Sequence, residues 1–303
     1  MEVPNELKNL YNHWQIHTIP PKPSSQKNLI SKTLYYKIIQ FANERMVIYE
    51  KKEQGATPPF TSNEILRKYR FCNIYRELDR QTIEFHTILK SLVSKPDIWL
   101  LNMLFSRFIC NTQTIKAVGL LNFDLKNNEL VYEKLMSLPR PKYGNAYIFP
   151  ISTIQKSKYD TREKFFCFYL PQVVQVITEE LFTLKGSSMS DALDRILPLF
   201  GFNLKFHWTE TLIDFCYQYP GHIDLYKQFP IGPGSLPTMK RLSNLDPELT
   251  CLRLVETVPL KFNYLTFNDN PIYLSAENWE GIGCEYRKYC NLINGGGRKR
   301  LFH

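Results

Sequence analysis

Three carboxylates stand in stretches of the chain that could do chemistry, namely Asp79, Glu280 and Glu285. A carboxylate stabilises the positive charge that develops on a sugar when a glycosidic bond breaks, and it can orient an attacking water. Glu280 and Glu285 are five residues apart on a predicted helix, so at most one of them is expected to point at a substrate. The other could pair with an arginine, and for Glu285 the alternative is a buried ion pair with Arg76 or Arg45 that holds the helix against the core.

A second polar group lies in the stretch 70–80, which reads RFCNIYRELDR. Its spacing predicts a helix with two faces. Such a polar face either lines a site or forms surface ion pairs worth about 0.3–0.5 kcal/mol each. The apolar face carries Phe71, Ile74, Tyr75 and Leu78, and the polar face carries Asn73, Arg76, Asp79 and Arg80.

A third stretch, 229–235, reads FPIGPGS. Gly232 and Gly234 bracket a proline and permit a tight turn, whose backbone N–H groups could bind a phosphate at the start of the next helix. Gly-Pro-Gly is also a common turn without a ligand. The spacing alone leaves both interpretations open.

The composition fits a folded protein with a basic surface. The chain has 303 residues and 44% hydrophobic residues, enough for a large core or for two smaller ones. Its net charge of +9 and pI of about 9.1 suit a polyanionic partner such as DNA. Charge alone leaves a protein without an acidic partner equally open, and the 14% aromatic residues suit both a core and base stacking.

The cysteine and histidine patterns predict no metal and no cofactor. Seven scattered cysteines without a Cys-x-x-Cys pair are typical of reduced, buried thiols in a cytosolic protein. His13 and His17 have the i, i+4 spacing of a metal-binding pair. No third ligand adjoins them in the sequence, so we expect two surface histidines.

The apolar segments predict a soluble, cytoplasmic protein, and we expect a monomer. The N-terminus lacks the basic and apolar regions of a signal peptide. The most apolar window, 98–110, is too short to cross a bilayer and is interrupted by Asn102, Ser106 and Arg107.

Hydrophobic periodicity predicts a mainly α protein. Residues 1–26 are expected to form a short appended helix and a proline-rich linker. Residues 27–294 form the predicted helical domain, with two lobes that meet near 140–165, and residues 295–303 form a basic tail. The strand candidate 146–151 predicts a small β-hairpin inserted among the helices. Helices are expected at 27–53, from 61–64 to about 95, and at 99–109, 165–184, 190–200, 208–219, 222–228, 246–258 and 276–293.

Several of these stretches resemble one family when they are taken together. The residues that carry the first match are Arg45, Gly55, Pro59, Thr61, Phe71, Asn73, Tyr75, Arg76, Asp79 and Arg80. The stretches 231–234 and 284–289 match as well and in the same order. The chain resembles, from about residue 27 to its C-terminus, the helical module of 5-hydroxymethyluracil DNA kinases and alpha-glutamyl/putrescinyl thymine pyrophosphorylases. That group is similar to helix-hairpin-helix DNA glycosylases.

The resemblance implies a helix-hairpin-helix DNA glycosylase-like fold and an enzyme that extrudes a modified pyrimidine from double-stranded DNA and excises it. Relatives are associated with hypermodified phage DNA, which implies a bulky base such as glucosylated hydroxymethylcytosine and a role in anti-phage defence. The DNA-binding and base-binding residues that the resemblance implies are Arg45, Arg70, Asn73, Arg76, Arg80, Gly232, Gly234, Ser235, Asn278, Lys288 and Tyr289.

The chain departs from this pattern at two positions. Asn278 stands where the family often has an acidic residue, so Glu280 becomes the first catalytic candidate and Glu285 the second. Ser235 and Leu236 stand where bifunctional glycosylases carry a lysine, which implies a monofunctional hydrolase that leaves an abasic site.

Two further features bear on the implied activity. Only Cys284 and Cys290 lie in the C-terminal region, so no iron–sulfur cluster is expected. The kinase half of the family is missing, since no phosphate-binding glycine loop of the P-loop type occurs. The alternatives are a transferase that builds a hypermodified thymine by displacing pyrophosphate, and a non-catalytic module that holds duplex DNA with Arg70, Arg76, the 232–234 turn and the basic tail.

Overall fold

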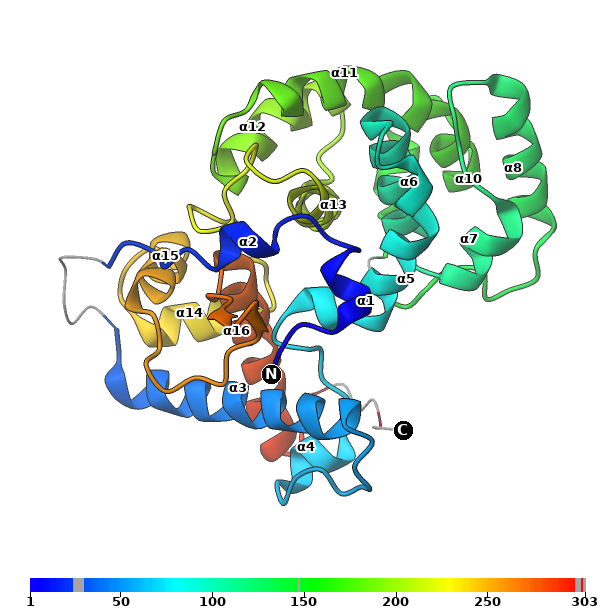
Figure 1. Ribbon diagram of the computed structural model, residues 1–303. Coiled ribbons are helices and arrows are strands. Elements are labelled where there is room, and N and C mark those ends of the chain that lie inside the picture. Colours follow the sequence, from blue (N-terminus) through cyan, green and yellow to red (C-terminus); the bar gives the residue numbers. More distant parts are fainter. Residues whose placement is uncertain (24–29, 147, 298–300, 302–303) are drawn as a thin grey trace. The chain divides into compact units, whose positions relative to one another are not determined.

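The computed structural model describes residues 1–23, 30–146, 148–297 and 301. Helices dominate both compact units into which the chain divides, so the predicted mainly α fold is confirmed (Figure 1). The first unit combines residues 1–79 with 225–303, and the second contains residues 80–224. The boundary expected near 140–165 falls inside the second unit. The first unit joins segments from both ends of the chain, which local periodicity does not reveal.

The first unit is built around its last helix, α16 (Ala276–Ile293), against which α3, α4, α14 and α15 pack (Figure 1). Polar residues cap these helices where the sequence offers them, as Ser31 does for α3 and Asp246 for α15. The other elements of the unit are α1 (Asn5–Lys8), α2 (Trp14–His17), α3 (Lys32–Glu53), α4 (Glu64–Lys68), the 3₁₀ helix η1 (Arg76–Leu78), α14 (Leu236–Leu242), α15 (Pro247–Thr257), β1 (Thr266–Phe267) and β2 (Asn270–Pro271).

The N-terminal segment is part of the first unit and not an appended extension. The Val3 N–H donates to Thr266 O, and the Thr266 N–H donates to Met1 O, both at 2.8 Å. Trp14 is 1% exposed, with its indole N–H bonded to Leu7 O at 3.0 Å. Leu7 of α1 and Trp14 of α2 therefore belong to the core. Residues 24–26 of the expected linker, 27–29 of the expected first helix, and 298–300 and 302–303 of the expected tail lie outside the described residues.

The second unit packs several helices around α6 (Pro96–Ile109), in which every residue from 99 to 109 is buried. A helix that is apolar on nearly all sides belongs in a core. The remaining elements of this unit are α5 (Arg80–Leu89), η2 (Lys90–Leu92), α7 (Thr112–Val118), α8 (Leu125–Ser137), α9 (Ile151–Gln155), α10 (Arg162–Lys164), the π-helix η3 (Phe165–Tyr169), α11 (Leu170–Thr183), α12 (Met189–Phe200) and α13 (Lys205–Gln218).

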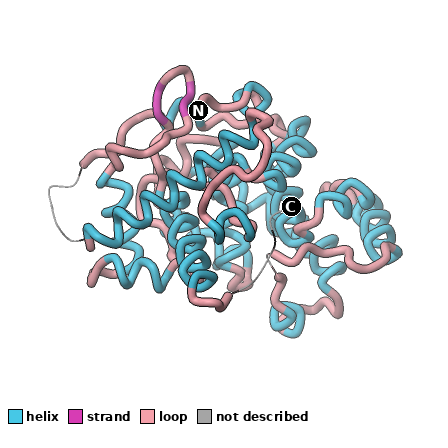
Figure 2. Tube along the Cα trace, turned by 90° about the horizontal axis from the view of Figure 1, so that it is seen from below, coloured by secondary structure: helices cyan, strands magenta, loops and turns pink. Residues whose placement is uncertain are grey.

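The small hairpin exists, but it lies elsewhere than predicted. The described residues of 146–151 form no strand, and α9 begins at Ile151, directly after Pro150, which has no N–H for strand pairing. The strands are β1 and β2, magenta in Figure 2. They are joined by Asn268 and Asp269, both with positive φ, and these residue types favour that conformation.

The stretch 70–80 is mostly irregular, contrary to the predicted helix, and contains only η1 and the first residue of α5. The Asn73 side chain donates to Leu78 O at 2.8 Å, and Asp79 accepts from the Asn73 N–H at 3.1 Å. Such side-chain bonds to the backbone compete with helix formation. The predicted apolar residues are nevertheless buried: Phe71, Ile74, Tyr75 and Leu78 are at most 5% exposed.

The segment 222–228 is also irregular where a helix was predicted. The Ser187 N–H donates to His222 O at 3.1 Å, and the Asp224 N–H donates to Ser187 O at 2.8 Å. These backbone groups are used in a bridge to a distant segment, so they are not available for a helix.

The structure also bears on the predictions for membranes and cysteines. Within the described ranges, no helix combines the length and the apolar character needed to cross a bilayer. The seven cysteines are free thiols. Four are buried as expected, Cys284 and Cys290 are half-buried, and Cys72 is exposed.

Candidate functional site

Helix α16 begins with a capping box that occupies Asn278. The Ser275 hydroxyl accepts from the Asn278 N–H at 3.4 Å, and Asn278 Oδ1 accepts from the Ser275 N–H at 2.9 Å. Asn278 is 4% exposed, and its amide donates to Glu277 Oε1 at 3.4 Å. Asn278, which stands where the family often has an acidic residue, therefore stabilises the N-terminus of α16.

The first face of α16 holds the 229–235 turn. Glu280 and Arg287 are two turns apart on this face. Glu280 Oε1 accepts from the Gly232 N–H at 3.2 Å, and the Arg287 guanidinium donates to Pro233 O at 2.8 Å. The Glu280 carboxylate thus binds a backbone N–H of the turn, and the Arg287 guanidinium binds a backbone C=O of the turn. Arg287, which was not among the predicted site residues, contributes one of these two contacts.

Small residues let the turn approach the helix closely. A Cβ added at Gly234 would lie 2.4 Å from Cys284 Sγ, and one added at Gly283 would lie 2.2 Å from Ser235 Oγ. Ser235 was predicted to bind DNA, but it is 0% exposed, so its side chain is not accessible to a DNA backbone in this structure. Among the described residues no partner is seen for the Gly234 N–H, which leaves it as a donor for an anion.

The second face of α16 holds the segment 70–73. Glu285 Oε2 accepts from the Cys72 N–H at 3.1 Å and lies 3.3 Å from Lys288 Nζ. Lys288 donates to Arg70 O and lies 4.5 Å from the centre of the Phe71 ring. Both charged side chains are thereby used to fix this segment.

Arg45 of α3 contacts the same segment from the buried side. It is 4% exposed and donates to Phe71 O at 3.2 Å and to Cys72 O at 3.4 Å. Burial lowers the pKa of Arg45, whereas the neighbouring carboxylates of Glu285 and Asp79 raise it. Arg45 therefore supports the segment from inside and does not extend into the solvent.

The remaining arginines of the predicted site differ in exposure. Arg70 is exposed, and Arg76 is half-buried in η1. Arg80 belongs to the second unit, where its exposed side chain pairs with Glu84 at 2.9 Å. Of these three, Arg70 is the side chain of the first unit best placed to meet a phosphate.

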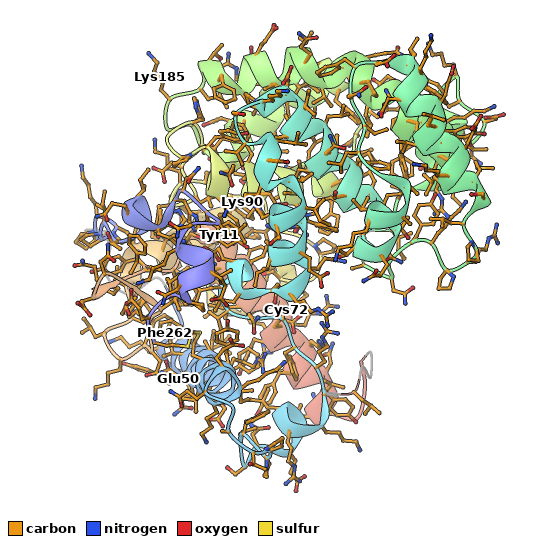
Figure 3. The ribbon with its side chains drawn as sticks, turned by 45° about the vertical axis from the view of Figure 1, so that its right-hand side comes forward. Tyr11, Glu50, Cys72, Lys90, Lys185 and Phe262 are labelled. Carbon is orange, nitrogen blue, oxygen red and sulfur yellow. The ribbon has the colours of Figure 1, made fainter. Side chains whose placement is uncertain are left out.

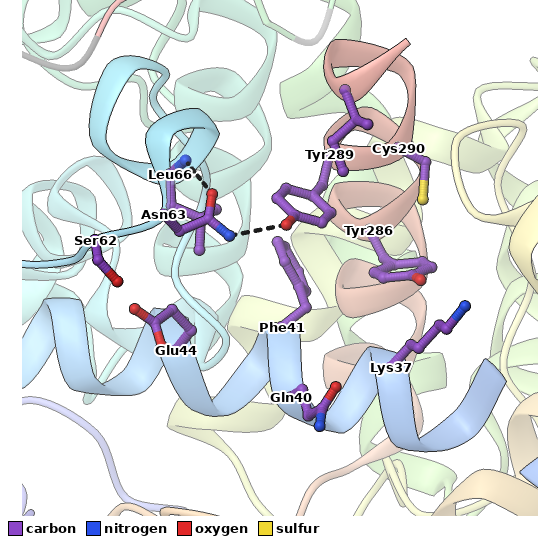
Figure 4. Close-up of a pocket in the computed structure, with 11 residues that line it drawn as sticks. Lys37, Gln40, Phe41, Glu44, Ser62, Asn63, Leu66, Tyr286, Tyr289 and Cys290 are labelled. Carbon is purple, nitrogen blue, oxygen red and sulfur yellow. Dashed lines mark hydrogen bonds between the residues drawn. The ribbon is translucent and has the colours of Figure 1, made fainter. Parts of the chain in front are cut away.

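The third face of α16 lines a cavity of about 590 Å³ together with α3 and α4 (Figure 4). The Asn63 amide donates to the Tyr289 hydroxyl at 2.8 Å, while Asn63 Oδ1 caps α4. Glu44 accepts from the Thr61 hydroxyl. The volume is in the range of small-molecule sites. The lining residues are Lys37, Gln40, Phe41, Glu44, Ser62, Asn63, Leu66, Tyr286, Tyr289, Cys290 and Ile293.

Glu280 does not line this cavity. Glu280 and Tyr289 are nine residues apart, which at about 100° per residue puts them on opposite sides of α16. The structure thus brings Glu280 to the turn, Glu285 and Lys288 to the 70–73 segment, and Tyr289 to the cavity. One carboxylate not chosen from the sequence, Glu277, is 5% exposed and more deeply buried than Glu280.

Replacing Gly234 with Ala is expected to weaken DNA binding about tenfold or more. The new Cβ would meet Cys284 Sγ at 2.4 Å, so the turn or the Cys284 side chain must shift, and either change disturbs the contact between the turn and α16. The measurement is fluorescence anisotropy with a duplex oligonucleotide. Gly221→Ala in the second unit, which is strained by its φ of 95° and lies outside the turn, serves as the control. Equal binding by Gly234→Ala and the wild type would show that the turn does not contact DNA.

The elements described above define a mainly α protein whose C-terminal helix holds a glycine-containing turn and a polar segment. The chain matches the sequence model of the family described as 5-hmdU DNA kinase, helical domain, over residues 32–295. It therefore belongs to this family, as its motifs indicated. No curated protein and no solved structure matches it.

Proposed function

We propose that the protein is a monofunctional DNA glycosylase that excises a hypermodified pyrimidine and leaves an abasic site. Membership of a family named for kinases of 5-hydroxymethyldeoxyuridine in DNA supports the processing of modified bases in DNA. The observation that carries the finer proposal is the contact between Glu280 Oε1 and the Gly232 N–H at 3.2 Å. It puts a carboxylate on the turn that would bind the DNA backbone.

The turn and the carboxylate together fit the needs of base excision. A phosphate bound at the Gly234 N–H would bring the adjoining deoxyribose close to Glu280. As the glycosidic bond breaks, positive charge develops on the sugar, and a fixed carboxylate stabilises it and orients the attacking water. The proton on the released base comes from solvent or from a group of the base pocket, and the water supplies the new hydroxyl on the sugar.

The other two carboxylates of the predicted site contact the 70–79 segment and not the turn. Glu285 Oε2 is engaged by the Cys72 N–H and by Lys288. Asp79 Oδ1 closes a local loop by accepting from the Asn73 N–H. We assign both to positioning the 70–79 segment and keep the catalytic role for Glu280.

Charge and sequence support the DNA substrate and the hydrolytic outcome. A net charge of +9 favours binding to a phosphate backbone. The start of α14 has Leu236 and Pro237 and no lysine, so this position offers no amine for a covalent sugar intermediate. Extruding a base costs a few kcal/mol, which is least for a base that pairs poorly. We infer a bulky base such as glucosylated hydroxymethylcytosine, and a role against phages that carry it.

The test uses matched duplexes, unmodified or with glucosylated hydroxymethylcytosine, incubated with the full chain and then treated with alkali. The proposal expects breaks in the modified strand alone, at the modified positions. No breaks in either duplex, with salt-sensitive binding retained, would overturn it and favour a binding module. A parallel duplex that carries pyrophosphorylated hydroxymethyluracil, incubated with an amine, would identify the transferase instead by release of pyrophosphate while the modified base stays attached to the DNA.

A further inference from the structure

Two histidines that were expected at the surface are buried in the first unit. His13 directly precedes α2 and is 1% exposed, and His17 ends α2 and is 6% exposed. Their rings are in edge contact, with centroids 4.5 Å apart. Glu77 of η1, also 1% exposed, faces them, and its Oε1 lies 2.9 Å from His13 Nε2. The structure thus supplies the third ligand that the sequence did not reveal.

We propose that His13, His17 and Glu77 form a binding site for a zinc-like divalent cation, which fixes the N-terminal segment to η1. One ligand atom from each residue lies within 4.8 Å of the other two. Tetrahedral zinc has bonds of about 2.0–2.2 Å, so its ligand atoms are roughly 3.3 Å apart. Side-chain movements that shorten these separations by about 1.5 Å or less would bring the ligand atoms to the spacing of a tetrahedral zinc site.

The donor chemistry suits zinc. Two imidazoles and one carboxylate are a common zinc ligand set, with water in the fourth position. His13 Nε2 and Glu77 Oε1 lie 2.9 Å apart, so one imidazole donor atom and one carboxylate donor atom already face each other.

Surrounding hydrogen bonds hold the backbone of the ligands in place. The hydroxyl of Tyr11, a residue labelled in Figure 3, donates to Glu77 O at 3.0 Å. The Tyr273 N–H donates to His17 O at 3.0 Å, and the Tyr226 hydroxyl donates to the same atom at 3.3 Å. These contacts fix the backbone from which His17 and Glu77 project.

A second buried histidine–carboxylate pair shows what distinguishes this site. In the second unit, His86 Nε2 lies 3.2 Å from Asp214 Oδ1. There Arg107 makes two bonds of 2.7 Å to the same carboxylate and supplies the positive charge. Within the described part of the chain, only the His13, His17 and Glu77 group has three suitable ligands together.

The test is a titration of the metal-free 303-residue chain with Co²⁺, followed by visible absorption, and with Zn²⁺, followed by calorimetry. We expect one equivalent to bind, with the strong visible absorption of tetrahedral Co²⁺, and a higher thermal midpoint in the bound state. His17→Gln and Glu77→Gln should each weaken binding at least about 100-fold. His222→Gln, a half-buried histidine of the second unit, should bind as the wild type does.

The outcomes are decisive even where one variant folds poorly. His17→Gln leaves the His13–Glu77 bond in place, and circular dichroism would verify its fold. The absence of saturable binding by the wild type would overturn the proposal, and so would undiminished binding by folded His17→Gln. Because the readouts are binding and thermal stability, the result does not depend on the proposed glycosylase activity.

Discussion

Replacing Glu280 with Gln is expected to lower the rate of base excision about 100- to 10,000-fold and to leave the fold and DNA binding intact. The Gln carbonyl oxygen can still accept from the Gly232 N–H, which now lies 3.2 Å from Glu280 Oε1. The change therefore removes the negative charge and keeps the contact that holds the turn. Single-turnover kinetics on a modified duplex measure the rate, and anisotropy measures the binding.

Glu285→Gln is the matched control on the same helix. Its carbonyl oxygen can still accept from the Cys72 N–H, now at 3.1 Å, and only the partly exposed pair with Lys288 is lost. Such pairs contribute little to stability. We expect activity within about tenfold of the wild type, well short of the loss that removing a catalytic group causes. The opposite order, with Glu285→Gln inactive and Glu280→Gln active, would move the catalytic role to Glu285.

Replacing Asp214 with Asn is expected to lower the free energy of unfolding by about 3–5 kcal/mol. Arg107 Nε and Nη2 each donate to the Asp214 carboxylate at 2.7 Å, and both side chains are at most 1% exposed. His86 lies 3.2 Å from the same carboxylate. Asn would leave the buried guanidinium without a balancing charge and would turn an acceptor into a donor. Urea unfolding followed by circular dichroism measures the loss.

An exposed ion pair provides the comparison for this prediction. The Arg80 side chain is 83% exposed and pairs with Glu84 one turn away. Arg80→Gln is expected to change the free energy of unfolding by less than about 1 kcal/mol. If Asp214→Asn were as mild as Arg80→Gln, the buried network would not stabilise the second unit in the way described.

Local signals in the sequence predicted much of the helical framework. Ser275 lies three residues before Asn278, and the predicted helix start at this serine is found in the structure. The predicted helix start at 61–64 was close, since α4 begins at Glu64, although Asn63 provides the cap. Caps and periodic apolar residues act within one or two turns, which is why the sequence alone shows them.

Features that depend on distant contacts were not predictable in the same way. In the stretch 70–80 the apolar residues were identified correctly as buried, but bonds of Asn73 and Asp79 to the backbone replaced the helix. The burial of His13 depends on Glu77, 64 residues away, and the contact between Glu280 and Gly232 spans 48 residues. No local pattern encodes such pairs.

The measurement that tests the central proposal most directly is mass spectrometry of the products formed from a duplex with glucosylated hydroxymethylcytosine. Wild-type protein is predicted to release the free modified base in a 1:1 ratio with abasic sites, and Glu280→Gln is predicted to release almost none. DNA that keeps every modified base, with no free base released, would contradict the assignment as a glycosylase.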